Sequence, residues 1–204
     1  MDNLLKVENI KLESFPHLKE ISFDVNKSEI IGIFCKIDNG QEQIIDSICG
    51  IKKIKEGKIS IVKNFYAIHH DSAIYEDLTV EENLDVFAKV FRTSIEENYH
   101  LIEDIYKQIE PFKKRRAGKL SGGMKQKLAL CCALIHKPKV LFLDEPTTGV
   151  DPVSRKEFWD MLKRLKTQGI TILVSTPYMD EASLCDRIAL IQNGSFLKID
   201  APQN

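Results

Sequence analysis

A short apolar run, 140–143, constrains the fold most, because it has no polar interruption and ends in two adjacent carboxylates, Asp144 and Glu145. A run of this kind is typical of a strand buried in a parallel sheet. The sequence therefore predicts a buried strand with two acidic side chains at its carboxyl end.

Strands and helices alternate along the rest of the chain. Two short β-rich segments, 4–12 and 18–25, predict an antiparallel sheet. A glycine-containing loop and then a helix over 43–49 are predicted to follow a third strand. The other predicted strands are 29–35, 58–62, 170–175 and a hairpin over 188–199.

Capping signals mark the later helices. Thr79 with Glu82, and Ser94 with Glu97, both fit the reciprocal capping box, and apolar residues at helical spacing follow each pair. Asp151 is the expected N-cap of a helix that Gly169 closes. The remaining predicted helices are one ended by Pro111, one over 120–135 and one over 180–185.

This alternation predicts the fold class. Strands interleaved with helices favour an α/β core. We expect a single folded unit, 1–204, with an antiparallel β subdomain and an inserted α-helical subdomain over about 79–135, of which 79–116 is the first part.

Composition excludes several classes of protein. The formal net charge of -1 gives no reason to expect nucleic acid as a partner, because such binding needs a concentrated basic face. No stretch approaches the ~20 apolar residues that cross a bilayer, and the N-terminus lacks the layout of a signal peptide, so a cytosolic location is expected. The five cysteines, and the adjacent histidines 69 and 70, lack the spacing of metal sites or disulfide frameworks.

The segment 120–126 carries the first chemical motif. Ser121, Gly122 and Gly123 stand at a helix start, where free backbone N–H groups and the positive end of the helix dipole attract phosphate. Alone, the segment could be an ordinary helix cap that contains two glycines.

The carboxylate pair is the second motif. Asp144 can hold Mg²⁺ through water, and Glu145 can orient or deprotonate an attacking water. Alone, such a pair suggests a solvated strand end. Here the sequence 147–151 follows directly and Ser175 ends the next predicted strand, which favours the chemical interpretation.

Together these motifs resemble the ATP-binding-cassette (ABC) family over about 75–194. In that family the segment from Ser121 to Gln126 corresponds to the signature motif. Asp144 and Glu145 correspond to the Walker B aspartate and the catalytic glutamate, and 149–151, with Asp151, to the D-loop. The sequences of 117–120 and 178–182 resemble those of the ATPase subunits of drug or small-molecule exporters.

The resemblance implies a P-loop NTPase-like (RecA-like) core sheet with ATP and Mg²⁺ as cofactors, and Asp144 as the metal ligand through water. Two such domains, in a homodimer or a heterodimer, would face head to tail. Each ATP would then lie between the Walker A loop of one domain and the signature motif of the other. The resemblance also implies an integral membrane permease as a partner, and hence a cytoplasmic position at the inner face of the cell membrane.

The phosphate loop departs from the family pattern. A working loop reads G-x-x-x-x-G-K-[ST], because backbone amides cradle the phosphates, the lysine meets the β/γ oxygens and the hydroxyl binds Mg²⁺. The corresponding residues here are Cys35, Gly40, Gln41 and Glu42, followed by Gln43. A neutral side chain replaces the lysine and a carboxylate replaces the hydroxyl. The sequence therefore predicts weak or absent nucleotide binding at 40–43.

Three further nucleotide-binding positions follow from the resemblance. His70 lies nearest the place of a glutamine that the family uses at the metal and the lytic water, in a segment shorter than usual. Pro177 stands where the family generally has a switch histidine, and proline cannot donate a hydrogen bond. Phe15 is the candidate for the aromatic ring that stacks on adenine, although it could equally be a core phenylalanine.

Three functional readings remain open at this point. The chain could be an exporter subunit that supplies its signature motif to a competent partner, with ATP hydrolysis only in that dimer. It could be a regulatory or interaction domain of the same fold without turnover. It could also be an active homodimeric ATPase whose loop tolerates Gln41.

Overall fold

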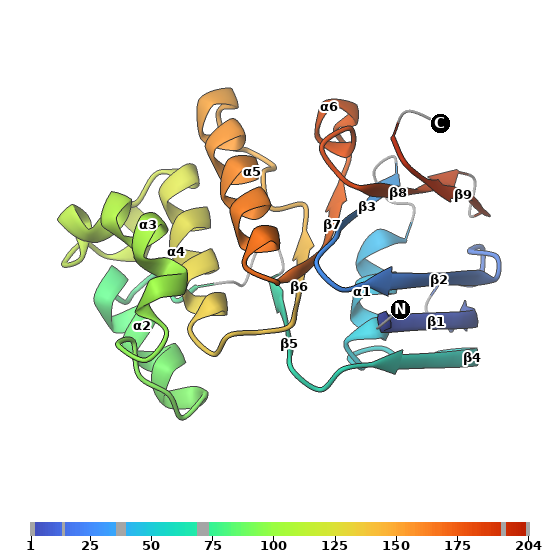
Figure 1. Ribbon diagram of the computed structural model, residues 1–204, viewed down its shortest axis with the longest axis horizontal. Helices are drawn as coiled ribbons and strands as arrows, with labels where there is room; N and C mark the ends of the chain where they lie inside the picture. The colour runs from blue at the N-terminus through green and yellow to red at the C-terminus, as the bar shows by residue number, and fades with distance from the viewer. Residues whose placement is uncertain (1–2, 14, 36–39, 69–73, 193–194, 203–204) are drawn as a thin grey trace.

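The structure is a computed structural model and describes residues 3–13, 15–35, 40–68, 74–192 and 195–202. Its centre is a six-stranded sheet with the order β5-β6-β7-β3-β8-β9 (Figure 1). Neighbouring strands are parallel except for the last pair, β8 and β9. The strands are β3 (Ile30–Cys35), β5 (Phe65–Ile68), β6 (Val140–Asp144), β7 (Thr171–Thr176), β8 (Arg187–Gln192) and β9 (Ser195–Asp200).

A second, antiparallel sheet packs on one side of this core. It has the order β2-β1-β4 and consists of β1 (Asn3–Leu12), β2 (Ile21–Asn26) and β4 (Ile54–Ile61). Helix α1 (Gln41–Ile48) contacts both β1 and β6. Its Ile44 and Ile45 are fully buried, in one apolar cluster with both sheets. Burial of these isoleucines therefore fixes the position of the helix that begins at Gln41.

The other helices gather on the opposite side of the six-stranded sheet (Figure 1). One apolar cluster joins α4 and α5 to the side chains of β6 and β7. None of the described helices combines the length and hydrophobicity needed to cross a lipid bilayer. These helices are α2 (Val80–Val90), α3 (Tyr99–Ile109), α4 (Gly122–Leu134), α5 (Pro152–Thr167) and α6 (Met179–Ala182), with short 3-10 turns η1 (Glu110–Phe112) and η2 (Ala117–Lys119).

Several local predictions are confirmed. The run 140–143 is a fully buried parallel strand, and the first β segments form an antiparallel sheet. Thr79 and Glu82 make the predicted capping box at the start of α2. The Asp151 carboxylate caps α5 by accepting hydrogen bonds from the Val153 and Ser154 backbone N–H groups.

Other local predictions are wrong. No strand is predicted over 65–68, but the structure has β5 there, in a parallel ladder with β6. Ser94 accepts a hydrogen bond from the Glu97 backbone N–H, but α3 begins only at Tyr99 and the Glu97 carboxylate bonds Thr93 instead. The boundaries also differ at β2, α1, β4 and α6, which begin at 21, 41, 54 and 179.

Candidate functional site

The carboxylates of Asp144 and Glu145 lie at the carboxyl end of β6, beside the end of β7. The Ser175 hydroxyl donates to Asp144 Oδ1 at 2.6 Å and accepts a 2.9 Å hydrogen bond from the Glu145 backbone N–H. In α/β proteins ligands bind at the carboxyl ends of parallel strands. This edge of the sheet is therefore the candidate site.

Gln41, the first residue of α1, lies against Glu145. Gln41 is only 8% exposed, and its Nε2 donates a 3.0 Å hydrogen bond to Glu145 Oε1. The other carboxylate oxygen, Oε2, accepts a 3.1 Å hydrogen bond from the Thr148 hydroxyl. Both oxygens of Glu145 are thus engaged within the chain.

The Gln41 amide is satisfied on one side only. Its Nε2 faces the carboxylate because an amide oxygen there would meet a second acceptor. Its Oε1 is buried and has no hydrogen-bond partner within the described part of the chain. A buried acceptor without a donor is destabilising, so Glu145 is the main polar anchor of this side chain.

The backbone around Gly40 is left-handed. Gly40 is the N-cap of α1 with a φ of 91°, and a Cβ built there would lie 3.0 Å from the Phe15 ring. Phe15 is half-buried and also packs against the apolar cluster between the sheets. The candidate adenine aromatic therefore lies beside the first turn of α1.

The first turn of α1 bears no cationic side chain. Its residues 41–43 are an amide, a carboxylate and a second amide, and Glu42 is exposed. Glu42 is the acidic residue of this turn. The turn thus combines the positive end of a helix dipole with an exposed negative side chain.

The signature segment forms a second group of candidate residues, at the start of α4. The Ser121 hydroxyl caps this helix by accepting a 3.3 Å hydrogen bond from the Met124 backbone N–H. A Cβ at Gly123 would lie 2.8 Å from Ser154, and one at Gly122 would lie 3.6 Å from the Gly149 carbonyl oxygen. The helix start therefore rests on 149–154, while Gln126 is half-buried one turn later.

The remaining predicted residues have mixed outcomes. Asp151 is exposed at the start of α5, and hydrogen bonds from Ser154 and Val153 lower the pKa of its carboxyl below the ordinary value. Pro177 follows β7 directly, in a turn where the Tyr178 backbone N–H donates to the Thr176 hydroxyl. His70 lies outside the described residues.

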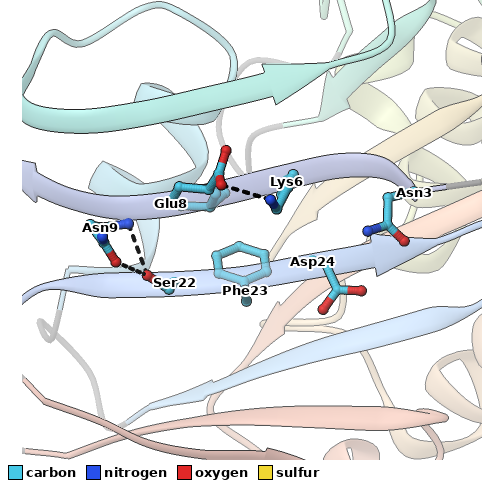
Figure 2. Close-up of a pocket in the computed structure, with 8 residues that line it drawn as sticks. Asn3, Lys6, Glu8, Asn9, Ser22, Phe23 and Asp24 are labelled. Atoms are coloured by element: carbon cyan, nitrogen blue, oxygen red, sulfur yellow. Dashed lines mark hydrogen bonds and ion pairs between the residues drawn. The ribbon is translucent and has the colours of Figure 1, made fainter.

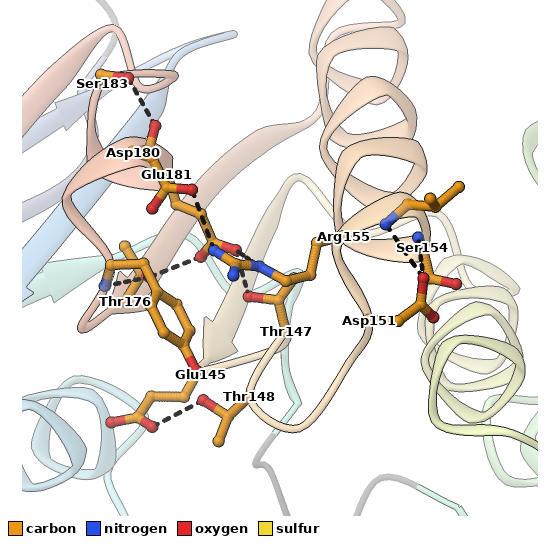
Figure 3. Close-up of polar contacts among 12 residues, drawn as sticks. Glu145, Thr147, Thr148, Asp151, Ser154, Arg155, Thr176, Asp180, Glu181 and Ser183 are labelled. Atoms are coloured by element: carbon orange, nitrogen blue, oxygen red, sulfur yellow. Dashed lines mark hydrogen bonds and ion pairs between the residues drawn. The ribbon is translucent and has the colours of Figure 1, made fainter.

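Sequence reasoning missed one buried carboxylate near the site. Glu181 is 2% exposed and accepts hydrogen bonds from Thr147, Arg155 and Thr176 (Figure 3). Its neighbours in sequence gave no signal, because an acidic pair in the first turn of a helix is also typical of a solvated helix start.

A surface pocket of about 570 Å³ lies away from these residues, on β1 and β2 (Figure 2). Several of its polar side chains are already paired with one another. Lys6 forms a 2.6 Å ion pair with Glu8, and the Ser22 hydroxyl donates to Asn9 Oδ1 at 2.7 Å. The pocket contains none of the motif residues, so the carboxyl edge of the sheet remains the candidate site.

Two curated relatives cover most of this chain. It is 35% identical over 202 residues to the probable multidrug ABC transporter ATP-binding protein YbhF of Escherichia coli K12, and the match covers 92% of this chain and 35% of that protein. It is 33% identical to the Nod factor export ATP-binding protein I of Burkholderia lata, across 89% of this chain and 65% of that protein. The chain thus spans about a third of one relative's length and just under two thirds of the other's.

Solved structures share the fold. A structure described as the ATP-binding subunit of an ABC transporter superposes with a TM-score of 0.85 and 25% identity, covering 97% of this chain and 90% of that one. The cbiO1 protein of Clostridium perfringens, part of the complex cbiONQ, gives a TM-score of 0.84 at 24% identity over all of this chain and 90% of its own. The fold is therefore that of an ABC ATPase, with a P-loop core sheet, an antiparallel β subdomain and a helical subdomain.

A family model confirms the resemblance that the motifs carry. The model of the ABC transporter family matches residues 18–148, which is more than half of the chain. The matched span includes the first turn of α1, the signature segment and the carboxylates at the end of β6. The chain belongs to the ABC transporter family.

Proposed function

We propose that this chain is the ATP-binding subunit of an ABC-type exporter and supplies its signature motif to the ATP site of a partner cassette. Its own phosphate loop binds ATP weakly or not at all. The observation that carries the proposal is the contact between Gln41 and Glu145, because a neutral amide stands in the place of the lysine and is tied to the catalytic carboxylate. The similarity to a probable multidrug ABC transporter ATP-binding protein of Escherichia coli and to a Nod factor export ATP-binding protein of Burkholderia lata supports the assignment to an exporter.

The electrostatics of the loop argue against a triphosphate. A hydrogen bond from a charged donor contributes about 1.5–3 kcal/mol, which corresponds to about a 10- to 150-fold change in affinity. Gln41 forfeits that contribution, and the exposed carboxylate of Glu42 repels phosphate and removes a hydroxyl ligand of Mg²⁺. The residues at 40–43 therefore do not fit a Mg-ATP complex, and hydrolysis is not assigned to this loop.

The signature motif, unlike the phosphate loop, is suited to bind phosphate. Ser121, Gly122 and Gly123 present the N-terminus of a 13-residue helix, with exposed residues at 121 and 122. Free backbone N–H groups and the helix dipole suit this end to the phosphates of a nucleotide held by another chain. The partner is accordingly a second cassette whose phosphate loop keeps its lysine.

The other members of the complex follow from the family. A membrane permease binds the cassette pair and selects the transported substrate. The chain then sits in the cytoplasm, at the inner face of the cell membrane. In such a pair one composite site hydrolyses ATP while the site that contains Gln41 stays idle.

A regulatory domain without turnover is the second candidate. The observation in its favour is that both oxygens of Glu145 are engaged, by Gln41 and by Thr148, which removes the carboxylate from a lytic water. This candidate predicts no ATPase activity in any cassette pair that contains the chain.

A complementation assay separates the two candidates. An acceptor variant, Gln41→Lys/Glu42→Ser/Ser121→Ala, combines a restored loop with a defective signature, and it is mixed with the unaltered chain. The proposal expects the mixture to hydrolyse Mg-ATP faster than either component alone, because only the unaltered chain offers an intact signature.

The controls concern the helix cap and the loop. Ser121→Ala in the donor should abolish the gain, whereas Thr79→Ala, which removes the N-cap of α2 instead, should preserve it. Calorimetry must show that the acceptor binds Mg-ATP. A mixture that stays inactive with a nucleotide-bound acceptor would refute signature donation, and sub-millimolar Mg-ATP binding by the unaltered chain would refute the impaired loop.

A further inference from the structure

Glu181 is a buried carboxylate with three donors from three segments. Its Oε1 accepts a 2.7 Å hydrogen bond from the Thr147 hydroxyl and a 2.9 Å one from Arg155 Nε, and its Oε2 accepts a 2.6 Å one from the Thr176 hydroxyl (Figure 3). A buried charge is tolerated only when it is paired and hydrogen-bonded. These donors therefore hold Glu181 in a single position.

The Arg155 side chain is held from a second direction. Its guanidinium lies 4.1 Å from the centre of the Tyr178 ring, and its Nη2 lies 3.3 Å from Asp180 Oδ2. The aromatic ring and the carboxylate together hold the planar guanidinium in one orientation. The first turns of α5 are thereby joined to the segment 178–181.

Two of the Glu181 partners bracket the segment that supports the signature motif. Thr147 precedes and Arg155 follows the residues 149–154. Within this segment, Ser154 lies so close to Gly123 that a Cβ at residue 123 would be 2.8 Å away, and the Gly149 carbonyl faces Gly122. Any displacement of 149–154 therefore moves the platform on which the start of α4 rests.

The third partner of Glu181, Thr176, directly precedes the switch position, Pro177. The Thr176 hydroxyl donates to Glu181 and accepts a 3.1 Å hydrogen bond from the Tyr178 backbone N–H, on either side of Pro177. The turn that lacks the family's histidine is thus fixed through the same carboxylate.

We propose that Glu181 is a positioning residue that sets the signature helix for a nucleotide held by the partner, acting through Thr147 and Arg155. This inference rests on the proposed signature donation. Glu181 touches no nucleotide in this arrangement. Instead, it fixes the distance between the switch position and the surface formed by Ser121, Gly122 and Gly123.

The test removes one hydrogen bond without changing shape. Thr147→Val deletes the hydroxyl that Glu181 accepts from, and Thr147→Ser keeps it. Thr171→Val is the matched control, because Thr171 is also fully buried but its hydroxyl bonds the Ser28 N–H and the Asn26 carbonyl instead of Glu181. Each substitution is made in the donor chain of the mixed complex described above.

Two readouts are expected to respond to Thr147→Val. Amide hydrogen exchange at Met124 and Lys125, whose N–H groups donate to the Ser121 hydroxyl and carbonyl, should accelerate by about tenfold in the isolated chain. In addition, kcat of the mixture should fall about tenfold or more with KM unchanged. Thr147→Ser should restore both values. Thr171→Val should lower Tm without changing either value.

Failures of the two proposals remain distinguishable. If Ser121→Ala leaves the mixture unaffected, signature donation fails, and the exchange rates of Met124 and Lys125 still decide the role of Glu181. If Thr147→Val leaves those rates unchanged, or Thr171→Val changes kcat and exchange equally, Glu181 does not position the signature helix.

Discussion

Gln41 Nε2 and Glu145 Oε1 are 3.0 Å apart and hydrogen-bonded, although the two residues are separated by 104 positions in sequence. The contact joins the residue that we predict in the place of the Walker A lysine to the residue that we predict in the place of the catalytic glutamate. It leaves Gln41 Oε1 buried without a described partner. The pair restrains the Glu145 carboxylate and is the basis on which we propose a weak phosphate loop.

Restoring the loop should restore binding. Gln41→Lys/Glu42→Ser supplies a cation and a hydroxyl at the first turn of α1, and we expect Mg-ATP affinity to rise about 10- to 150-fold by calorimetry. Glu42→Ser/Gln43→Lys is the control, since it makes the same change in net charge but places the lysine two positions along the helix. Equal gains in both variants would mean that net charge, rather than the lysine position, controls binding.

The hydrogen bond between Gln41 and Glu145 should be measurable as an interaction free energy between the two side chains. In a double-mutant cycle, Gln41→Ala and Glu145→Ala should show an interaction of about 1–2 kcal/mol in the free energy of unfolding by denaturant. The corresponding cycle with Gln43→Ala and Glu145→Ala should be additive. Additivity in the first cycle would contradict the hydrogen bond.

The signature helix should tolerate a methyl group at one glycine only. Gly123→Ala places a Cβ 2.8 Å from Ser154 and should lower the free energy of unfolding by about 1–3 kcal/mol, whereas Gly122→Ala meets its nearest atom at an ordinary 3.6 Å and should not. Ser154→Gly should rescue Gly123→Ala, because it removes the facing Cβ. Ser154→Ala retains that Cβ, so equal rescue by both would refute the steric account.

Acid should reveal the cap of α5. Hydrogen bonds from Ser154 and Val153 hold the pKa of Asp151 below its ordinary value of 3.8, so the unfolded chain binds the proton more tightly. The stabilisation is present above that ordinary value and disappears as the pH falls through the lower, folded-state pKa. Asp151→Asn keeps a capping side chain without the titration. We expect the stability difference between the two proteins to change below about pH 4, and a gap that is constant from pH 7 to pH 3 would contradict this.

Local chemistry determined a large part of this protein. The capping box of Thr79 and Glu82 and the cap at Asp151 close within three residues, so the sequence predicts them without knowledge of the fold. The apolar run 140–143 predicts its own burial, and the glycines at 122 and 123 mark a helix start. The alternation of strands and helices predicted the fold class, and the resemblance of 120–126 and 144–151 to the ABC motifs predicted the family.

Only the tertiary structure decided the contacts between distant segments. The place of β5 in the sheet depends on its ladder with β6, a strand remote in sequence. The bonds of Gln41 to Glu145 and of Thr147 to Glu181 form because parallel strands bring their carboxyl ends to one edge of the sheet, where side chains 104 and 34 positions apart meet. Hydrogen bonds act over about 3 Å, and a linear sequence does not record which remote residues the packed core brings within that reach.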